Sequence, residues 1–74
     1  MKYIRDDKAI KLLGKKVREF RKKQKISQSQ LAYEANIPRM QVSRIERGEI
    51  NTSISTILAI ARVLDIQVKE FFNF

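Results

Sequence analysis

The 74-residue sequence contains no cysteine and no histidine. The commonest general base, thiol nucleophile and metal ligands are therefore absent, and no disulfide framework is possible. Glycine occurs only at Gly14 and Gly48, so there is no glycine-rich loop to cradle a phosphate. The eight acids are scattered apart from Asp6 and Asp7, where helix capping explains them. We expect no catalytic residues, no metal site and no cofactor, and an enzyme is not predicted.

Long apolar runs are also missing. No segment approaches the roughly 20 consecutive apolar residues that a membrane-spanning helix needs. The first ten residues, MKYIRDDKAI, place acids where a signal peptide has its apolar centre, so export is not expected. The 43% apolar content is nevertheless ordinary for a folded chain. These features predict one small domain over residues 1–74, located in the cytoplasm and without a membrane partner.

Positive charge is abundant and unevenly distributed. The net charge is +8, and residues 1–25 hold eleven Lys/Arg against three acids, whereas residues 26–47 net +1 and residues 48–74 net −1. A polyanion is the natural partner for such a surface. Charge alone fits a lysine-rich solvated helix equally well, and it does not separate DNA from RNA or an acidic protein.

Hydrophobic periodicity predicts an all-α chain of five short helices. The first follows a lead-in at residues 1–5, is capped by Asp6 or Asp7 and ends near residues 24–25. Its apolar face consists of Ile10, Leu13, Val17 and Phe20. Gly14 interrupts this helix at a cost of ~1 kcal/mol relative to alanine. We favour one continuous helix, with residues 1–12 as an N-terminal extension being the alternative.

The C-terminal third predicts a loop and two further helices. Residues 49–52 lack periodicity, and Ser53 can cap a fourth helix. The apolar stripe of that helix comprises Ile54, Ile57, Leu58, Ala61 and Leu64, widened by Ile60 and Val63. A break at residues 65–67 precedes a final turn or two at residues 68–72. No apolar/polar alternation bounded by turn pairs argues for a hairpin.

The stretch of residues 27–48 predicts two short helices joined by a tight corner. Ser27 followed by Gln30 fits a capping box at the start of the first. Asn36 tolerates the left-handed conformation at its end, and Pro38 suits the first turn of a new helix. The second helix, residues 39–47, then ends at Gly48.

The outer face of helix 39–47 is basic. Arg39, Met40, Ser43, Arg44 and Arg47 share this face, while Val42 and Ile45 point the other way. A face of this kind favours a helix-turn-helix, in which the second helix enters a DNA groove and the first braces it. The two helices would be locked by Leu31, Ala35, Ile37, Val42 and Ile45, with Ala32 as the small residue where they touch. From periodicity alone, a plain α-hairpin in a small bundle remains the alternative.

Four motifs together resemble one known family. They are RxxR at Arg18 and Arg21, ISQSQLA at 26–32, NIP at 36–38 and VSRIERG at 42–48. This combination is similar to the Cro/repressor-type, or XRE-like, helix-turn-helix regulators over about residues 13–72. Two positions depart from the family pattern: Asn36 replaces the usual glycine, and Pro38 replaces a Ser/Thr cap worth ~1 kcal/mol.

The resemblance implies a fold and a function. The fold is a compact five-helix DNA-binding domain whose helices 2 and 3 form the helix-turn-helix. The function is sequence-specific binding of double-stranded DNA by a transcriptional regulator, most often a repressor, in a prokaryotic or phage-like context. The family typically binds a palindromic operator as a homodimer, through the helix at residues 39–47.

The resemblance also implies roles for individual residues. By position, the base-reading residues are Arg39, Met40, Ser43 and Arg44. The phosphate contacts are Gln28, Arg21, Arg47, Asn51 and Thr52. Arg21 and Glu46 match positions that pair between the first helix and the end of the third, so we expect a partly buried, structural salt bridge between them.

The aromatic C-terminus predicts the dimer seam. Phe71, Phe72 and Phe74 offer more aromatic surface than one short helix easily buries. One of Phe71 and Phe72 should close the monomer core. The other, with Phe74, is the better candidate for a contact across a two-fold axis.

Two alternative functions stay open at this stage. One is an antitoxin-type regulator that also binds a protein partner, and the other is a protein- or RNA-binding bundle. RNA readers usually present aromatic platforms, and neither Tyr3 nor Tyr33 belongs to the exposed face of helix 39–47. No small-molecule effector or effector domain is evident, so regulation is expected to come through concentration, oligomerisation or a partner.

Overall fold

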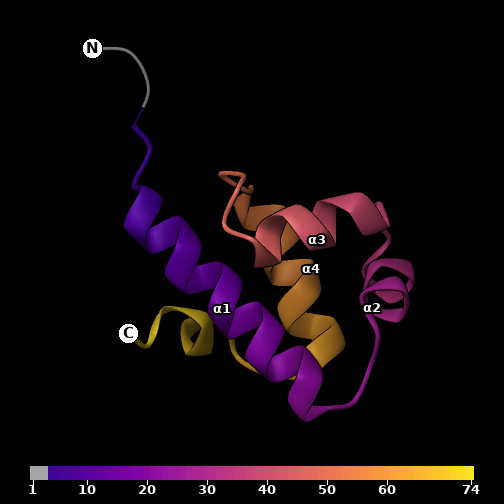
Figure 1. The fold of residues 1–74 in the computed structure, drawn as a ribbon. Coiled ribbons are helices and arrows are strands. Elements are labelled where there is room, and N and C mark those ends of the chain that lie inside the picture. The colour runs from indigo at the N-terminus through magenta and orange to yellow at the C-terminus, as the bar shows by residue number, and fades with distance from the viewer. Residues whose placement is uncertain (1–3) are drawn as a thin grey trace.

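Four α-helices and one 3-10 helix follow one another along residues 4–74, the part of the chain that the computed structural model describes (Figure 1). They are α1 (Asp7–Lys23), α2 (Gln28–Ala35), α3 (Arg39–Glu46), α4 (Ile54–Leu64) and η1 (Val68–Phe72). The predicted all-α class is confirmed, although the fifth element is a 3-10 helix, a form that chains use in such short pieces. The predicted lead-in at residues 1–5 falls partly outside the described residues. Within those residues, no helix has the length and apolarity to cross a membrane.

Side-chain caps set the starts of three helices. Asp6, Ser27 and Ser53 each accept a hydrogen bond from the backbone N–H three residues later, at 3.0, 3.0 and 3.2 Å. The capping box at α2 is only half formed. The Gln30 side-chain amide donates to Glu34 at 2.9 Å instead of reaching back to Ser27.

A left-handed residue lies at or just after the end of each of the four α-helices. Asn36 closes α2 with φ 60° and ψ 45°, as predicted for the residue that stands in for glycine. Gly48 follows α3 with φ 71°, which suits a residue without a Cβ. Pro38 precedes α3 and gives no side-chain cap. Lys25 and Asp65 also have positive φ, 60° and 55°, and no sequence signal predicted either of them.

Helix α1 runs unbroken through Gly14, which confirms the favoured prediction. The reason for this glycine lies in the packing of α1 on α3. A Cβ at residue 14 would lie 2.2 Å from the carbonyl oxygen of Ile45 and 3.0 Å from that of Glu46. The backbones of α1 and α3 therefore touch at this point, and only glycine leaves room for the contact.

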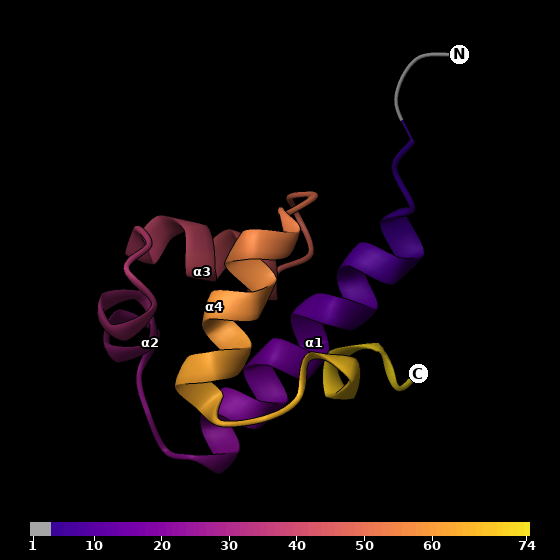
Figure 2. The ribbon, with the colours of Figure 1, turned by 180° about the vertical axis from the view of Figure 1, so that it is seen from behind.

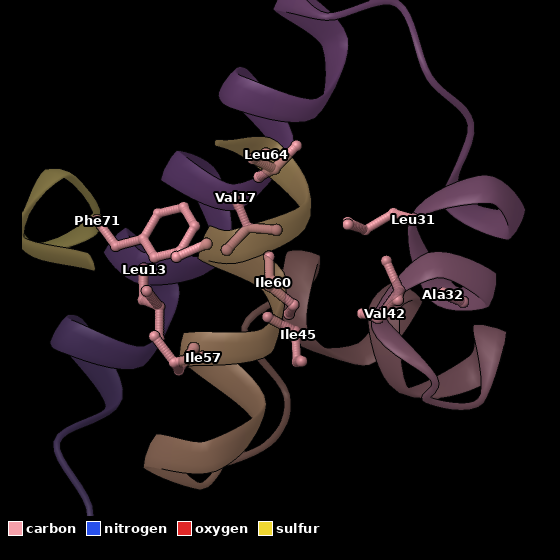
Figure 3. Packing of buried hydrophobic residues seen from close by; sticks show 12 residues of the cluster. Leu13, Val17, Leu31, Ala32, Val42, Ile45, Ile57, Ile60, Leu64 and Phe71 are labelled. Carbon is pink, nitrogen blue, oxygen red and sulfur yellow. The ribbon is translucent and has the colours of Figure 1, made fainter. Parts of the chain in front are cut away.

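All five helices contribute side chains to the hydrophobic core (Figure 3). Helix α3 packs on α1 and α2, α2 also packs on α4, and η1 packs on α1 and α4 (Figure 2). The largest fully buried side chains are Phe71, Leu31, Ile45, Ile60, Leu64, Val17 and Val42. Phe71 also meets the ring of Phe20 edge-on, with centroids 5.9 Å apart.

The apolar stripe of α4 is narrower than its sequence predicts. Ile57, Ile60, Ala61 and Leu64 are buried at i, i+3, i+4 and i+7. Ile54 and Leu58, which the prediction placed on the same stripe, are 76% and 43% exposed. That part of the prediction is wrong, because four residues already fill the strip of α4 that faces the core.

Candidate nucleic-acid interface

One side of α3 is buried in the core, and the opposite side is exposed to solvent. Val42 and Ile45 are 0% and 2% exposed where α3 meets α1 and α2. Arg39, Met40 and Arg44 are exposed on the opposite side, with Met40 at 62%. In Figure 1, α3 crosses the outer side of the bundle, away from η1.

The predicted base-reading residues share the outer side of α3. Ser43 lies among them and is half-buried. The ion pairs within residues 4–74 involve neither Arg39 nor Arg44. Two charged guanidiniums, one hydroxyl and one thioether on a single helical face are the groups that contact base edges in a major groove.

The expected ion pair between Arg21 and Glu46 is present and buried. Arg21 Nε donates to Glu46 Oε2 at 2.6 Å, and Arg21 Nη2 donates to Glu46 Oε1 at 3.0 Å. The two side chains are 11% and 1% exposed. The hydrogen bonds to Glu46, followed by its charge, outweigh desolvation and raise the pKa of Arg21 above its ordinary value. This bidentate pair joins α1 to the end of α3.

Two more hydrogen bonds extend this ion pair to α2. Gln28 Nε2 donates to Glu46 Oε1 at 3.0 Å. Arg21 Nη1 donates to the carbonyl oxygen of Ile26 at 2.9 Å, just before α2 begins. Arg21 therefore directs all three nitrogens inward, and this does not fit the direct phosphate contact expected of it.

A second arginine–glutamate pair, exposed to solvent, lies just beyond the end of α3. Arg47 Nε and Glu49 Oε2 are 3.0 Å apart, and the side chains are 54% and 49% exposed. Arg5 Nη2 donates to the Glu49 carbonyl at 3.0 Å, and Arg5 Nε pairs with Asp7 at 2.6 Å. Sequence reasoning missed both Arg5 and Glu49, since neither belongs to a motif.

Asn51 and Thr52, the two loop residues expected to contact phosphates, differ from each other in exposure. Asn51 is exposed. The hydroxyl oxygen of Thr52 is buried and, within residues 4–74, has no hydrogen-bond partner. A phosphate contact through this hydroxyl does not fit that position.

The fold has counterparts among known proteins. A family model described as helix-turn-helix matches residues 17–71. The chain belongs to the helix-turn-helix family. The match spans the α2–α3 corner and continues to Phe71, so it includes the core as well as the motif.

Named relatives of this helix-turn-helix chain share most of its length. It is 41% identical over 64 residues to the control protein C.BamHI of Bacillus amyloliquefaciens, covering 85% of this chain and 79% of that protein. It is 43% identical over 56 residues to the immunity repressor of Bacillus phage phi105, covering 76% of this chain and 39% of the repressor. The chain therefore spans less than half of the phage repressor.

A solved structure of similar fold is the restriction–modification controller protein C.AhdI from Aeromonas hydrophila. The TM-score is 0.84 at 36% identity, and the match covers 85% of this chain and 96% of the controller. The helix-turn-helix assignment therefore rests on sequence and on three-dimensional structure alike.

The helix-turn-helix protein also has an apolar groove of about 400 Å³ away from α3. It lies between the start of α1, the α3–α4 loop, α4 and η1. Its lining includes Ile4, Ile10, Ile50, Ile54, Leu58 and Phe72. Phe72 and Phe74 are 53% and 56% exposed, with ring centroids 6.4 Å apart. Phe71 is the phenylalanine that closes the core, so Phe72 is the outer one.

Proposed function

We propose that this DNA-binding transcriptional regulator reads a palindromic operator as a homodimer, through the outer face of α3. The supporting observation is the exposure of Arg39, Met40 and Arg44 on a helix whose other side is fixed in the core. The two arginines suit guanine O6 and N7, and Met40 suits a thymine methyl. Ser43, half-buried between them, completes the reading face.

Other residues fix the register on the phosphates without reading bases. Gln28 at the start of α2, Arg47 just after α3 and Asn51 in the loop between α3 and α4 serve this role. Arg21 and Thr52 do not, because their polar atoms are buried. The lysines of α1 add a salt-sensitive attraction that does not depend on sequence.

The second copy covers the apolar groove. A groove of about 400 Å³ beside two exposed phenylalanine rings is self-complementary, since each copy offers a projection and a recess. Most of the lining belongs to residues 48–74, which carry a net charge of −1, and the rest belongs to residues 4–13, which carry only +1. The repulsion between two copies is therefore small at this groove. A dimer places two α3 helices on half-sites about one DNA turn apart.

The similarity to a control protein and to a phage immunity repressor supports a role in regulating transcription. The similarity to the immunity repressor favours repression over activation. Because these relatives come from a bacterium and a bacterial phage, we infer that the operator lies in bacterial or phage DNA and that the protein acts in the cytoplasm. No observation on residues 4–74 favours a toxin partner or RNA. Tyr33, although 86% exposed, lies on α2, and Tyr3 lies outside the described residues.

Selection from random duplex DNA at near-physiological salt tests the function. We expect a two-fold symmetric consensus whose half-sites are centred roughly 10 base pairs apart, or a multiple of that. The variant Arg39→Ala with Arg44→Ala should bind DNA without enriching a consensus. If the wild-type protein recovers no motif, the operator proposal is overturned and the protein- or RNA-binding bundle is favoured.

Sedimentation of the variant Phe72→Ala with Phe74→Ala tests the dimer. We expect this variant to be a folded monomer and the control Tyr33→Ala to remain a dimer. Truncation after residue 70 cannot test the dimer, because it also removes Phe71, which is 0% exposed and belongs to the core of the monomer. A double variant that sediments as the wild-type dimer does would place the seam elsewhere.

A further inference from the structure

One carboxylate collects hydrogen bonds from two helices at the edge of the interface. Glu46 Oε1 accepts from Arg21 Nη2 and from Gln28 Nε2, both at 3.0 Å, and Oε2 accepts from Arg21 Nε at 2.6 Å. We call these three residues the carboxylate network. It is more elaborate than an ion pair that only joins α1 to α3, since its third member is the first residue of α2.

The network fixes which way the Gln28 amide faces. An ionised carboxylate only accepts hydrogen bonds, so the nitrogen of the amide, and not its oxygen, must face Glu46. An amide nitrogen carries two hydrogens, and only one of them is used by Glu46. The second points away from the carboxylate, from a side chain that is half-buried at the start of α2. Glu46 therefore presents one N–H donor of Gln28 in a set direction.

Arg21 makes this arrangement compatible with a nearby phosphate. An uncompensated carboxylate in contact with Gln28 would repel the phosphate that Gln28 contacts. The bidentate guanidinium cancels that charge, and its third nitrogen is engaged by the carbonyl of Ile26. Each of the three nitrogens makes a hydrogen bond within the protein, and the Arg21 side chain is only 11% exposed, so Arg21 neutralises Glu46 without facing the phosphate itself.

We propose that Glu46 is a positioning residue that aims Gln28 at a DNA phosphate, and that Arg21 compensates its charge without touching the DNA. This inference rests on the proposed function, in which Gln28 contacts phosphate. It assigns the phosphate contact at this place to a neutral amide, and the buried pair acts through that amide.

A double-mutant cycle tests the proposal. The variant Arg21→Met with Glu46→Met removes the pair while leaving net charge unchanged, and replacing a buried ion pair by apolar side chains is often neutral for folding. Gln28→Ala removes the amide, and the third variant combines all three substitutions. Gln30→Ala is the control, since it removes the same side chain two residues on, where the amide bonds Glu34 instead.

Affinity for a short operator duplex is measured over a range of salt concentrations. We expect Gln28→Ala to lose about tenfold per half-site, the paired Met variant to lose about as much, and their combination to lose no more. The salt slope should stay at the wild-type value throughout. The proposal would be overturned if the folded Arg21→Met, Glu46→Met variant bound with wild-type affinity. It would also be overturned if the losses of this variant and of Gln28→Ala added up in the combined variant. A slope lowered by about 0.9 per half-site would show that Arg21 itself neutralises a phosphate.

A measurement on the wild-type protein avoids any dependence on variant folding. Nuclear magnetic resonance resolves the two side-chain amide protons of Gln28. On adding the duplex, we expect the proton facing Glu46 to keep its shift and its slow exchange, while the other proton moves. Loss of protection at the first proton would mean that Gln28 leaves Glu46 to reach DNA, which overturns the proposal. If the wild type binds no duplex at all, the proposed function fails together with it.

Discussion

Two arginine–glutamate pairs lie at the C-terminal end of α3, and they differ mainly in burial. Arg21 and Glu46 are 11% and 1% exposed, whereas Arg47 and Glu49 are 54% and 49% exposed. Each arginine uses two nitrogens on its glutamate, at 2.6 and 3.0 Å in the buried pair and at 3.0 and 3.4 Å in the exposed one.

The difference in burial separates a structural role from a binding role. A buried pair contributes little net stability over apolar residues, but removing one partner strands a charge in the core. An exposed pair is worth about 0–1 kcal/mol and exchanges readily with water or with another anion. The buried pair, with Gln28, joins three helices, whereas the exposed pair leaves Arg47 free to exchange Glu49 for the phosphate that we propose it contacts.

Arg21→Ala should give the largest effect and separate the two pairs most clearly. It leaves Glu46 buried without its partner, so the free energy of unfolding should fall by about 3–5 kcal/mol, with a loss of DNA affinity. Arg47→Ala should change it by less than about 1 kcal/mol. Denaturant titration with circular dichroism measures both. An Arg21→Ala protein with reduced affinity but an unchanged melting temperature would make Arg21 a phosphate contact only.

Gly14→Ala tests the contact between the backbones of α1 and α3, the two helices that the buried ion pair joins. Helix propensity alone predicts a gain of ~1 kcal/mol. The added methyl would instead lie 2.2 Å from the Ile45 carbonyl oxygen, so we expect a loss of about 3 kcal/mol. Lys15→Ala, at the next and exposed position of α1, is the control and should not lower stability. A stabilised Gly14→Ala protein would show that α1 does not touch α3 here.

Arg44→Ala moves the comparison to the exposed side of α3. We expect a loss of ~1–3 kcal/mol in binding the preferred operator, a relaxed base preference at one position of each half-site, and unchanged stability. Competition between operator variants measures the preference. Arg62→Ala removes the same charge from α4 and should leave that preference intact. Losses that are equal on every sequence would remove Arg44 from the base-reading set.

Glu49→Gln should give the smallest effect and the opposite sign. Freeing Arg47 from its carboxylate should raise affinity for DNA about twofold to fivefold on all sequences, with stability changed by less than about 1 kcal/mol. Fluorescence anisotropy at two salt concentrations measures this gain. Glu70→Gln makes the same change in net charge on η1 and serves as the control. Equal gains in both variants would attribute the effect to net charge and not to Arg47.

The structural features that depend on residues close in the sequence could be predicted from the sequence alone. Ser27, Asn36 and Pro38 act within one turn, so they predicted the corner between α2 and α3. The outer face of α3 followed from helical spacing, because residues three or four apart share a side whatever surrounds them. The partnership of Arg21 and Glu46 came from the family resemblance and not from spacing, since the two residues are far apart in the chain.

The tertiary structure decided what depends on distant partners. Gly14 looked like a weak point of a helix, and it is the place where two backbones touch. Gln28 and Arg47 looked like free polar side chains, yet each is bonded to a glutamate. Ile54 and Leu58 fit a core stripe by period but lie outside it. Helical spacing determines which residues share a side, whereas the packing of the other helices determines which side is covered.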